Sequence, residues 1–336
     1  MNDARLSKTA KIALLVLLAA AVLLAAPMVG MSRVSLSAVL RPFSQSRQTD
    51  IFWHLRVPRV LVSFLAGAAL AVSGMTFQAM FRNALATPFT LGVSSGASLG
   101  ASVYILSGVQ ISVLGVSGVS LAAFGGALVA ILLVYCLSSL RGGLSAGTML
   151  LAGVAVSFFF ASMILFIQYL SDFTNTFRIL RWTMGGLGTV GYDSVLDVLP
   201  FVLSGSAIVL LLTNELNLIT TGEDIAASRG VNVAGAKRVL FFATSLMVGG
   251  VVAICGPIGF VGMMSPHICR LLIGPDHRHL TPATLLFGGM FLTLCDLLAR
   301  TVIAPAELPV GVITALLGGP FFLWLLLRAS HDRGTL

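Results

Sequence analysis

The chain has 336 residues, of which 57% are hydrophobic and 10% are charged, and its formal net charge is +8. A soluble domain carries about 25% charged residues, so this chain has too few to cover a globule of its length. The composition excludes a soluble enzyme, a nucleic-acid-binding domain and a disordered chain. Long apolar runs, rather than short alternating segments, favour an all-α polytopic membrane protein over a β-barrel.

The first half of the chain predicts six membrane spans, since a helix needs about 20 mostly apolar residues to cross the hydrocarbon core. The N-terminal apolar run is long for a signal peptide and further spans follow it, so we interpret it as an uncleaved helix. The charge-free stretch 83–140 has room for two spans, with breaks near Thr87-Pro88 and around Ser107 to Ser112. The predicted spans are 12–32, 60–81, two within 83–140, 142–171 and about 195–213.

The second half predicts four more spans. The run 239–269 is too long for one helix, and Gly256-Pro257 divides it into two spans joined by a tight turn. The last spans are 282–303 and 309–328. We therefore expect about ten transmembrane helices in a single membrane domain, 1–336, with both termini on one side.

Small residues recur inside the predicted spans. Gly92, Gly96 and Gly100 repeat every fourth residue, a spacing that lets a second helix approach closely. Ordinary tight packing is the plain interpretation of each single glycine. Together they predict a compact bundle.

The basic residues set the expected topology. With the N-terminus in the cytoplasm, all three lysines (Lys8, Lys11 and Lys237) lie on the inner side, as the positive-inside rule favours. The outer arginines concentrate between Arg33 and Arg59, and topology alone does not explain this concentration.

No motif for catalysis or metal binding is present in the sequence. The nearest string to a phosphate-binding loop, GGLSAGT at 142–148, lacks the lysine, so the chain is not expected to hydrolyse ATP alone. His277 and His279 flank Arg278 in a predicted solvated turn. Asp296 and Arg300 have the spacing of a local helical ion pair. We expect no catalytic residue and no metal site.

The one long cytoplasmic loop covers about 215–238. Gly222, Glu223 and Asp224 predict the start of a short helix, because acidic residues suit the first turn, and Arg229 with Gly230 predicts its end. A short capped helix pair held between two spans would form a rigid docking element for a cytoplasmic partner. An ordinary connector is the alternative.

Four strings, in order over nearly the whole chain, resemble the FecCD-type (BtuC-like) permease subunits of iron-siderophore, haem and vitamin B12 ABC importers. The strings are RVPRVLVSFLAGAALAVSGMTFQAMFRNALATPFTLGVSSGA (56–97), TGEDIAASRGV (221–231), GPIGFVGMMSPHICRLLIGPDHRHLTP (256–282) and AELPVGVITALLGGPFFLWLL (306–326).

This resemblance implies the type II ABC importer permease fold and a homodimer in the cytoplasmic (inner) membrane, with two cytoplasmic ABC ATPase subunits and an external substrate-binding protein. It implies no cofactor in this chain, since ATP and Mg would bind the partner ATPase, and no nucleic acid. The implied ATPase-coupling residues are Glu223, Asp224, Ala227, Ser228, Arg229 and Gly230. The implied binding-protein docking residues are Arg56, Arg59 and Arg300, which would account for the outer basic excess.

The resemblance also implies a cytoplasmic gate and a translocation path. The gate residues are Asn83, Leu85, Ser145, Ala146 and Gly147; here Ala84 replaces the usual proline of the RNPLA string. The path residues are Met75, Gln78, Ser162, Phe166 and Tyr169, for which helix packing is the alternative.

The function implied is ATP-driven import of an iron complex, either a ferric siderophore or haem. A vitamin B12 importer permease of the same family is the alternative, followed by an ATP-independent secondary transporter and a signalling or assembly protein. Arg178 and Arg181, in the external stretch after the fifth span, would suit an anionic ligand or serve as interfacial anchors.

Overall fold

The computed structural model describes residues 7–30, 35, 39, 46–113, 115–140, 145–188 and 191–331. Five arginines lie outside these ranges, namely Arg5, Arg33, Arg41, Arg141 and Arg333.

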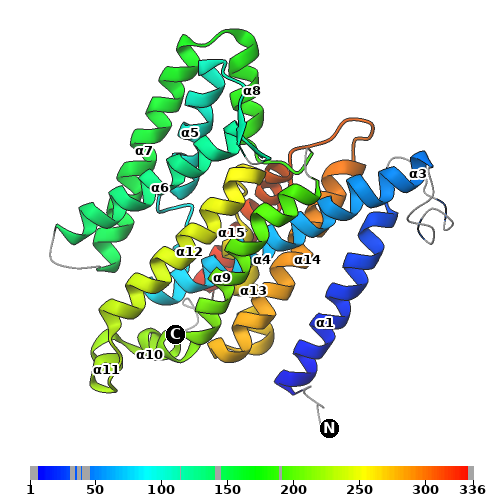
Figure 1. Cartoon of the computed structure of the whole chain (residues 1–336). Helices are drawn as coiled ribbons and strands as arrows, with labels where there is room; N and C mark the ends of the chain where they lie inside the picture. Colours follow the sequence, from blue (N-terminus) through cyan, green and yellow to red (C-terminus); the bar gives the residue numbers. More distant parts are fainter. Residues whose placement is uncertain are drawn as a thin grey trace.

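Apolar helices make up most of the described chain (Figure 1). Seven are long and apolar enough to cross a membrane: α1 (Lys8–Ala25), α4 (Val57–Phe81), α6 (Gly118–Ser139), α7 (Ala146–Leu170), α9 (Tyr192–Leu211), α12 (Val233–Cys255) and α14 (His277–Thr301). Two shorter apolar helices are α5 (Val93–Ser107) and α13 (Val261–Ile273), and α15 (Val310–His331) contributes the shorter apolar segment Val310–Leu325. Each predicted span coincides with one of these helices, which confirms the all-α membrane fold. The predicted division of 239–269 falls between α12 and α13.

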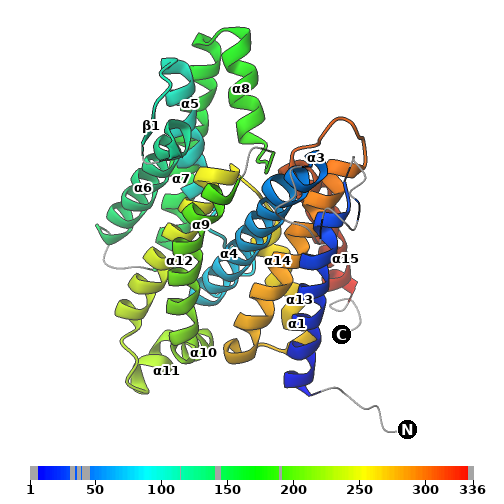
Figure 2. The same ribbon diagram turned by 45° about the vertical axis from the view of Figure 1, so that its right-hand side comes forward.

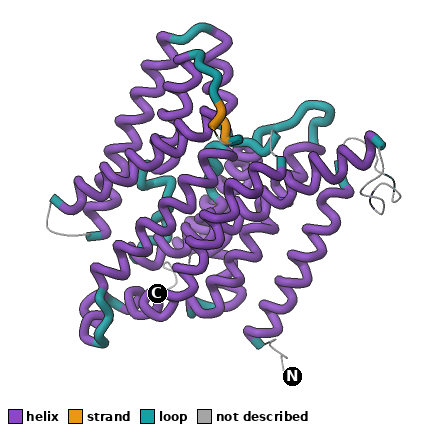
Figure 3. Tube along the Cα trace, viewed as in Figure 1, coloured by secondary structure: helices purple, strands orange, loops and turns teal. Residues whose placement is uncertain are grey.

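Short elements gather at the two ends of the bundle, outside the predicted spans except for Ala26–Met28, which falls within 12–32. One end carries α10 (Thr213–Thr221) and α11 (Glu223–Ser228). The opposite end carries α8 (Phe173–Thr183), η1 (Ala26–Met28), α3 (Arg47–Asp50) and the π-helical turn η2 (Ile51–Arg56). Two antiparallel strands of two residues each, β1 (Ser112–Val113) and β2 (Val116–Ser117), pair Ser112 with Ser117 and are drawn in orange in Figure 3.

Side-chain caps fix where several helices begin. Ser117, Ser145 and Asp172 accept hydrogen bonds from the backbone N–H three residues ahead, at 3.2, 3.2 and 2.7 Å, and so begin α6, α7 and α8. The turn after α12 depends on Gly256, whose φ of 66° lies in the region that favours glycine.

Helix α4 is the central element, and it packs against α9, α12, α13 and α14 (Figure 2). Glycines let the backbones meet directly. A Cβ on Gly67 would overlap the carbonyl oxygen of Gly288 in α14, and one on Gly74 would overlap that of Gly262 in α13. Glycine-mediated approach of this kind stabilises membrane helices through van der Waals contact.

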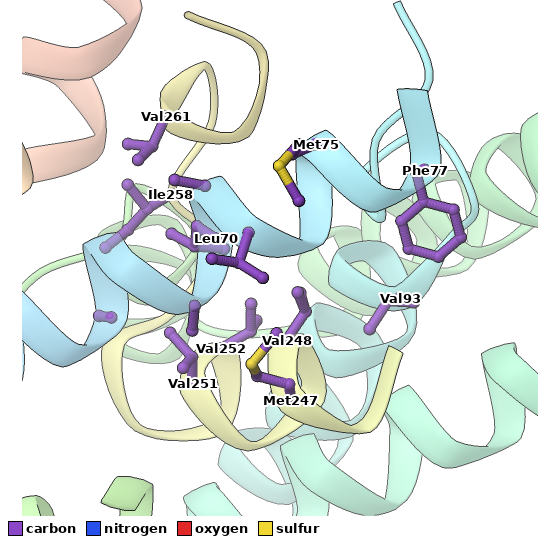
Figure 4. Close-up of a cluster of buried hydrophobic side chains, with 14 of the residues drawn as sticks. Leu70, Met75, Phe77, Val93, Met247, Val248, Val251, Val252, Ile258 and Val261 are labelled. Atoms are coloured by element: carbon purple, nitrogen blue, oxygen red, sulfur yellow. The ribbon is translucent and has the colours of Figure 1, made fainter. Parts of the chain in front are cut away.

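The largest buried cluster extends through most of the bundle, and Figure 4 shows its part around α4 and α12. Leu70 of α4 faces Val248 and Val252 of α12, and Ile258 from the following turn closes one side. Helices α6 and α7 instead leave many apolar side chains exposed on the single chain, including Leu132, Phe158 and Leu165. Such a surface requires lipid or a partner helix around it.

Candidate functional site

The predicted short helix pair is present in the loop between α9 and α12. Gly222, with a φ of 142°, separates α10 from α11, and Gly230, with a φ of 84°, follows the end of α11. Ile219, Ala226 and Ala236 form a small buried cluster beneath the pair. The two short helices therefore have their own core, as a rigid docking element needs.

One ion pair ties this helix pair to the bundle. Nζ of Lys237 lies 2.6 Å from Oε1 of Glu223, and the lysine side chain is only 3% exposed. The other five predicted coupling residues are exposed on the surface of α11 and just after it: Asp224, Ala227, Ser228, Arg229 and Gly230. Glu223 thus has a structural partner, whereas the rest of the predicted set faces outward.

The predicted gate residues lie where α4 ends and α7 begins. Arg82 adopts a φ of 49°, and the Oδ1 atom of Asn83 accepts a hydrogen bond from the N–H of Leu85 at 2.9 Å. The Leu85 side chain is 58% exposed. Ser145 caps α7, and Ala146 and Gly147 form its first turn. The gating role of these residues stays a prediction.

A large open cavity runs between α5, α7, the turn after α12 and α15. Its volume is about 1160 Å³, and its lining includes Phe89, Phe158 and Phe260. Ser94 and Ser157 also line it, and their buried hydroxyls have no hydrogen-bond partner among the described residues. We call this space the apolar cavity.

A second cavity of about 750 Å³ opens at the α8 end, and we call it the outer cavity. Arg178 and Arg181 of α8 line it, together with Asp193, Asp197 and Glu307. Both arginine side chains are exposed. Within the described residues, the two guanidinium groups remain available to a negatively charged ligand.

The same three segments of the chain contribute to the lining of both cavities, and glycines let their backbones meet. Gly185, Gly256 and Gly311 bring together the end of α8, the turn after α12 and the start of α15. A Cβ on Gly185 would overlap the carbonyl oxygen of Pro257, and one on Gly311 would overlap that of Met184. The N–H of Gly186 donates to the carbonyl oxygen of Cys255 at 2.8 Å. We call this contact the glycine junction.

The three predicted docking arginines converge at the α8 end but point inward. Arg56 is 6% exposed and donates to the carbonyl oxygen of Pro27 at 3.1 Å, and Arg300 is 4% exposed and donates to that of Ala26 at 2.9 Å. Both therefore bind the C-terminal end of the first span. In this conformation they hold the subunit together, and their contact with a binding protein stays a prediction.

Arg59 joins this network to the outer cavity. Its side chain, 12% exposed, binds both Asp296, which is fully buried, and Glu307, whose side chain is 33% exposed. The Nε atom of Arg300 lies 3.7 Å from Asp296. The expected local pair of Asp296 with Arg300 is present, but Arg59 makes the shorter contact with this carboxylate.

The predicted path residues divide into two groups. Met75 is fully buried beneath α14, and Gln78 contacts Gly262 and Arg270. Neither side chain lines the apolar cavity or the outer cavity. Ser162, Phe166 and Tyr169 are exposed on α7, with Tyr169 at 86%. That either group lines the translocation path stays a prediction. In the structure, Met75 packs between helices.

The carboxylates of Asp296 and Glu307 and the hydroxyls of Ser94 and Ser157 were not in the sequence-predicted site. An acidic residue inside an otherwise apolar span is itself a functional signal, and Asp296 is such a residue. Nothing in the sequence distinguishes Ser94 and Ser157 from the many other serines of these helices.

A family model described as the FecCD transport family matches residues 15–328. The chain belongs to the FecCD transport family. It is therefore an ABC importer permease, an all-α polytopic transport subunit with the type II importer fold.

Named relatives cover most of the chain. The uncharacterised ABC transporter permease protein YvrB of Bacillus subtilis is 42% identical over 85% of this chain and 81% of its own length. The hemin transport system permease protein HmuU of Yersinia pestis is 38% identical over 93% and 94%. The vitamin B12 import system permease protein BtuC of Escherichia coli O157:H7 is 40% identical over 83% and 84%.

A solved structure agrees with the fold. It is an inward-facing conformation of a metal-chelate type ABC transporter, with a TM-score of 0.84 and 31% sequence identity, and it covers 94% of this chain and 98% of its own. The FecCD fold assigned from sequence strings is thus confirmed in three dimensions.

Proposed function

We propose that this FecCD permease imports an iron complex, a ferric siderophore or haem, across the cytoplasmic membrane. The observation that carries the substrate class is the outer cavity, where Arg178 and Arg181 are exposed beside a space of about 750 Å³. Haem propionates and many ferric chelates carry negative charge, and exposed guanidinium groups attract carboxylates and related anions. The HmuU relative, named for hemin transport, supports the same class.

The complex we propose is a homodimer with two cytoplasmic ATPase subunits and an external substrate-binding protein. ATP and Mg would bind the ATPase subunits, and no cofactor would bind this chain. The exposed surface of α11 would bind the ATPase. The α10–α11 end would then be cytoplasmic, and both termini would lie on that side. Binding protein would approach the α8 end, where Arg59 and Glu307 reach the rim of the outer cavity.

Alternating access would then move the ligand from the outer cavity, past the glycine junction, to the apolar cavity. Asn83, Leu85 and Ser145–Gly147 would close the cytoplasmic exit. Met75 and Gln78 would not line this path, because their side chains are enclosed by α13 and α14.

A vitamin B12 permease is the second candidate, and the BtuC relative supports it. Cobalamin is a bulky ligand that is neutral or weakly charged. Its import would therefore not depend on Arg178 and Arg181. An ATP-independent carrier is a third candidate, distinguished by its need for no partner.

The test is uptake into liposomes that contain the purified permease with its ATPase, supplied with the binding protein. We expect accumulation of a ferric siderophore or haem that requires ATP, and thermal protection of the binding protein by the same ligand. Protection and uptake of cobalamin alone would assign the chain to vitamin B12. Accumulation without the ATPase would overturn the ABC importer mechanism.

A further inference from the structure

One residue of the short helix pair holds the first turn of α14. Oδ1 of Asn217, in α10, accepts a hydrogen bond from the backbone N–H of His277 at 2.9 Å and lies 2.8 Å from Nδ1 of the same residue. Its Nδ2 atom donates to Oδ1 of Asp276 at 2.8 Å. The single amide thus satisfies groups on two successive residues of another segment, 59 and 60 positions away.

The contact is reinforced one helical turn earlier. Oδ1 of Asn214 accepts a hydrogen bond from Nε of Arg278 at 2.7 Å. Because Asn214 and Asn217 are three residues apart, they lie on the same face of α10. Asp276 in turn caps α14 by accepting from the N–H of Arg278 at 3.1 Å. The two asparagines therefore hold the start of α14 at its cap, the point where the helix axis is set.

Helix α14 carries this contact to the far end of the molecule. It runs without a break from His277 to Thr301, which is 25 residues, or about 36 Å of helix. Its other end bears Asp296 and Arg300, which contact Arg59 and the end of the first span. One rigid helix thus joins the short helix pair to the arginine network at the rim of the outer cavity.

We propose that Asn217 is a positioning residue that couples α11 to the outer end of α14. This rests on the proposed function, in which α11 seats in an ATPase. A displacement of α11 by the ATPase moves α10, and the hydrogen bonds of Asn217 pass this movement to α14 rather than letting the two helices separate. The movement reaches Asp296 and its partner Arg59, next to the place where a binding protein would dock.

Replacement of Asn217 by leucine removes all the hydrogen bonds of its amide, and it keeps the branch at Cγ and the number of side-chain heavy atoms. We expect the complex with the ATPase to assemble and to keep its basal ATP hydrolysis. Stimulation of hydrolysis by the binding protein, and the amount of substrate taken up per ATP, should each fall about tenfold, within the usual range of coupling between sites.

Asn232→Ala is the matched control. Asn232 caps α12 in the same loop region by accepting from the N–H of Gly235 at 2.9 Å, and it makes no described contact with α14. This variant should lose a cap but keep normal stimulation. A purely structural Asn217 would lower the melting temperature of N217L as N232A does and leave the uptake per ATP unchanged, and that result would overturn the proposal.

If N217L does not assemble, Asn214→Ala takes its place, because that substitution removes only the hydrogen bond from the exposed Arg278 side chain. A partial fall in stimulation then supports the coupling role, and wild-type stimulation overturns it. Failure of the proposed function would look different: the wild-type complex itself would show no ATP-dependent uptake.

Discussion

Arg59 holds Asp296 through two nitrogen atoms, with Nε and NH2 at 3.0 and 2.9 Å from Oδ1. The carboxylate is fully buried, and it belongs to α14 whereas the guanidinium belongs to α4. Charged pairs inside a membrane domain require partners within the protein, since lipid supplies none. The pair therefore links the two central helices at the α8 end.

Asp296→Asn is expected to destabilise the permease by about 3 kcal/mol, because it leaves Arg59 and Arg300 without their buried counter-charge. Glu307→Gln should cost less than about 1 kcal/mol, since the Glu307 side chain is partly exposed and its ion pair is screened by water. Denaturation of the purified protein in detergent measures both. Equal losses for the two variants would contradict the assignment of Asp296 as the principal partner.

Gly74→Ala should disrupt the contact between α4 and α13, because the added Cβ would overlap the backbone of Gly262. Forced overpacking costs about 1–3 kcal/mol, and here backbone must move to relieve it. Gly125→Ala in α6 is the control, since no atom lies within 4 Å of its added Cβ. Thermal unfolding should show a clear loss for G74A and none for G125A; similar curves would disprove the close contact.

The sequence predicted the membrane spans well because each depends only on local hydropathy. Even the division at Gly256-Pro257 follows from residues next to each other, and the Gly96–Gly100 repeat does pack against another backbone, that of α6. Helix α8 was predicted only as part of the stretch that follows the fifth span, because its 11 residues are amphipathic rather than apolar. Periodicity of that kind is weak over three turns.

The site was harder to predict, because its contacts join distant segments. Arg59 and Asp296 are 237 positions apart, and Asn217 and His277 are 60 apart. No pattern in the residues next to either partner predicts these contacts. The surface of α11 was predictable, in contrast, because its glycines and acidic first turn are adjacent in the chain.

Asp224→Lys should weaken association with the ATPase while leaving the permease folded, because Asp224 is exposed and has no described ion pair. Glu223→Lys should do more, since it also places a second cation against the buried Lys237. Co-purification measures the first effect and the melting temperature the second. A D224K variant that retains the ATPase as well as wild type does would contradict the docking role of this surface.

Asp276 predicts a specific pH dependence. The hydrogen bond from Asn217 is the main cause that holds the pKa of this carboxyl below its usual value. Its charge therefore stabilises the fold above the unfolded pKa of about 3.9, and that contribution is lost as pH falls through the lower folded value. Asp276→Asn keeps a capping side chain, so its melting-temperature deficit should persist down to about pH 5 and shrink below about pH 4. A deficit unchanged at pH 3 would show that the charge is not involved.

The double substitution Arg178→Gln with Arg181→Gln should reduce uptake of an anionic ligand about tenfold or more at low salt, and less at high salt, because the attraction is electrostatic. ATP hydrolysis without substrate should be unchanged. Arg47→Gln, on α3 outside the cavity lining, is the control. Unchanged uptake would assign the two arginines to the membrane interface instead.

The glycine junction has a consequence for selectivity. Where Gly185, Gly256 and Gly311 meet, peptide groups are in direct contact and leave no room for a Cβ atom. A selective side chain cannot be added at these three positions. A change of substrate specificity is therefore expected first at Arg178 and Arg181 or in the protein that delivers the cargo.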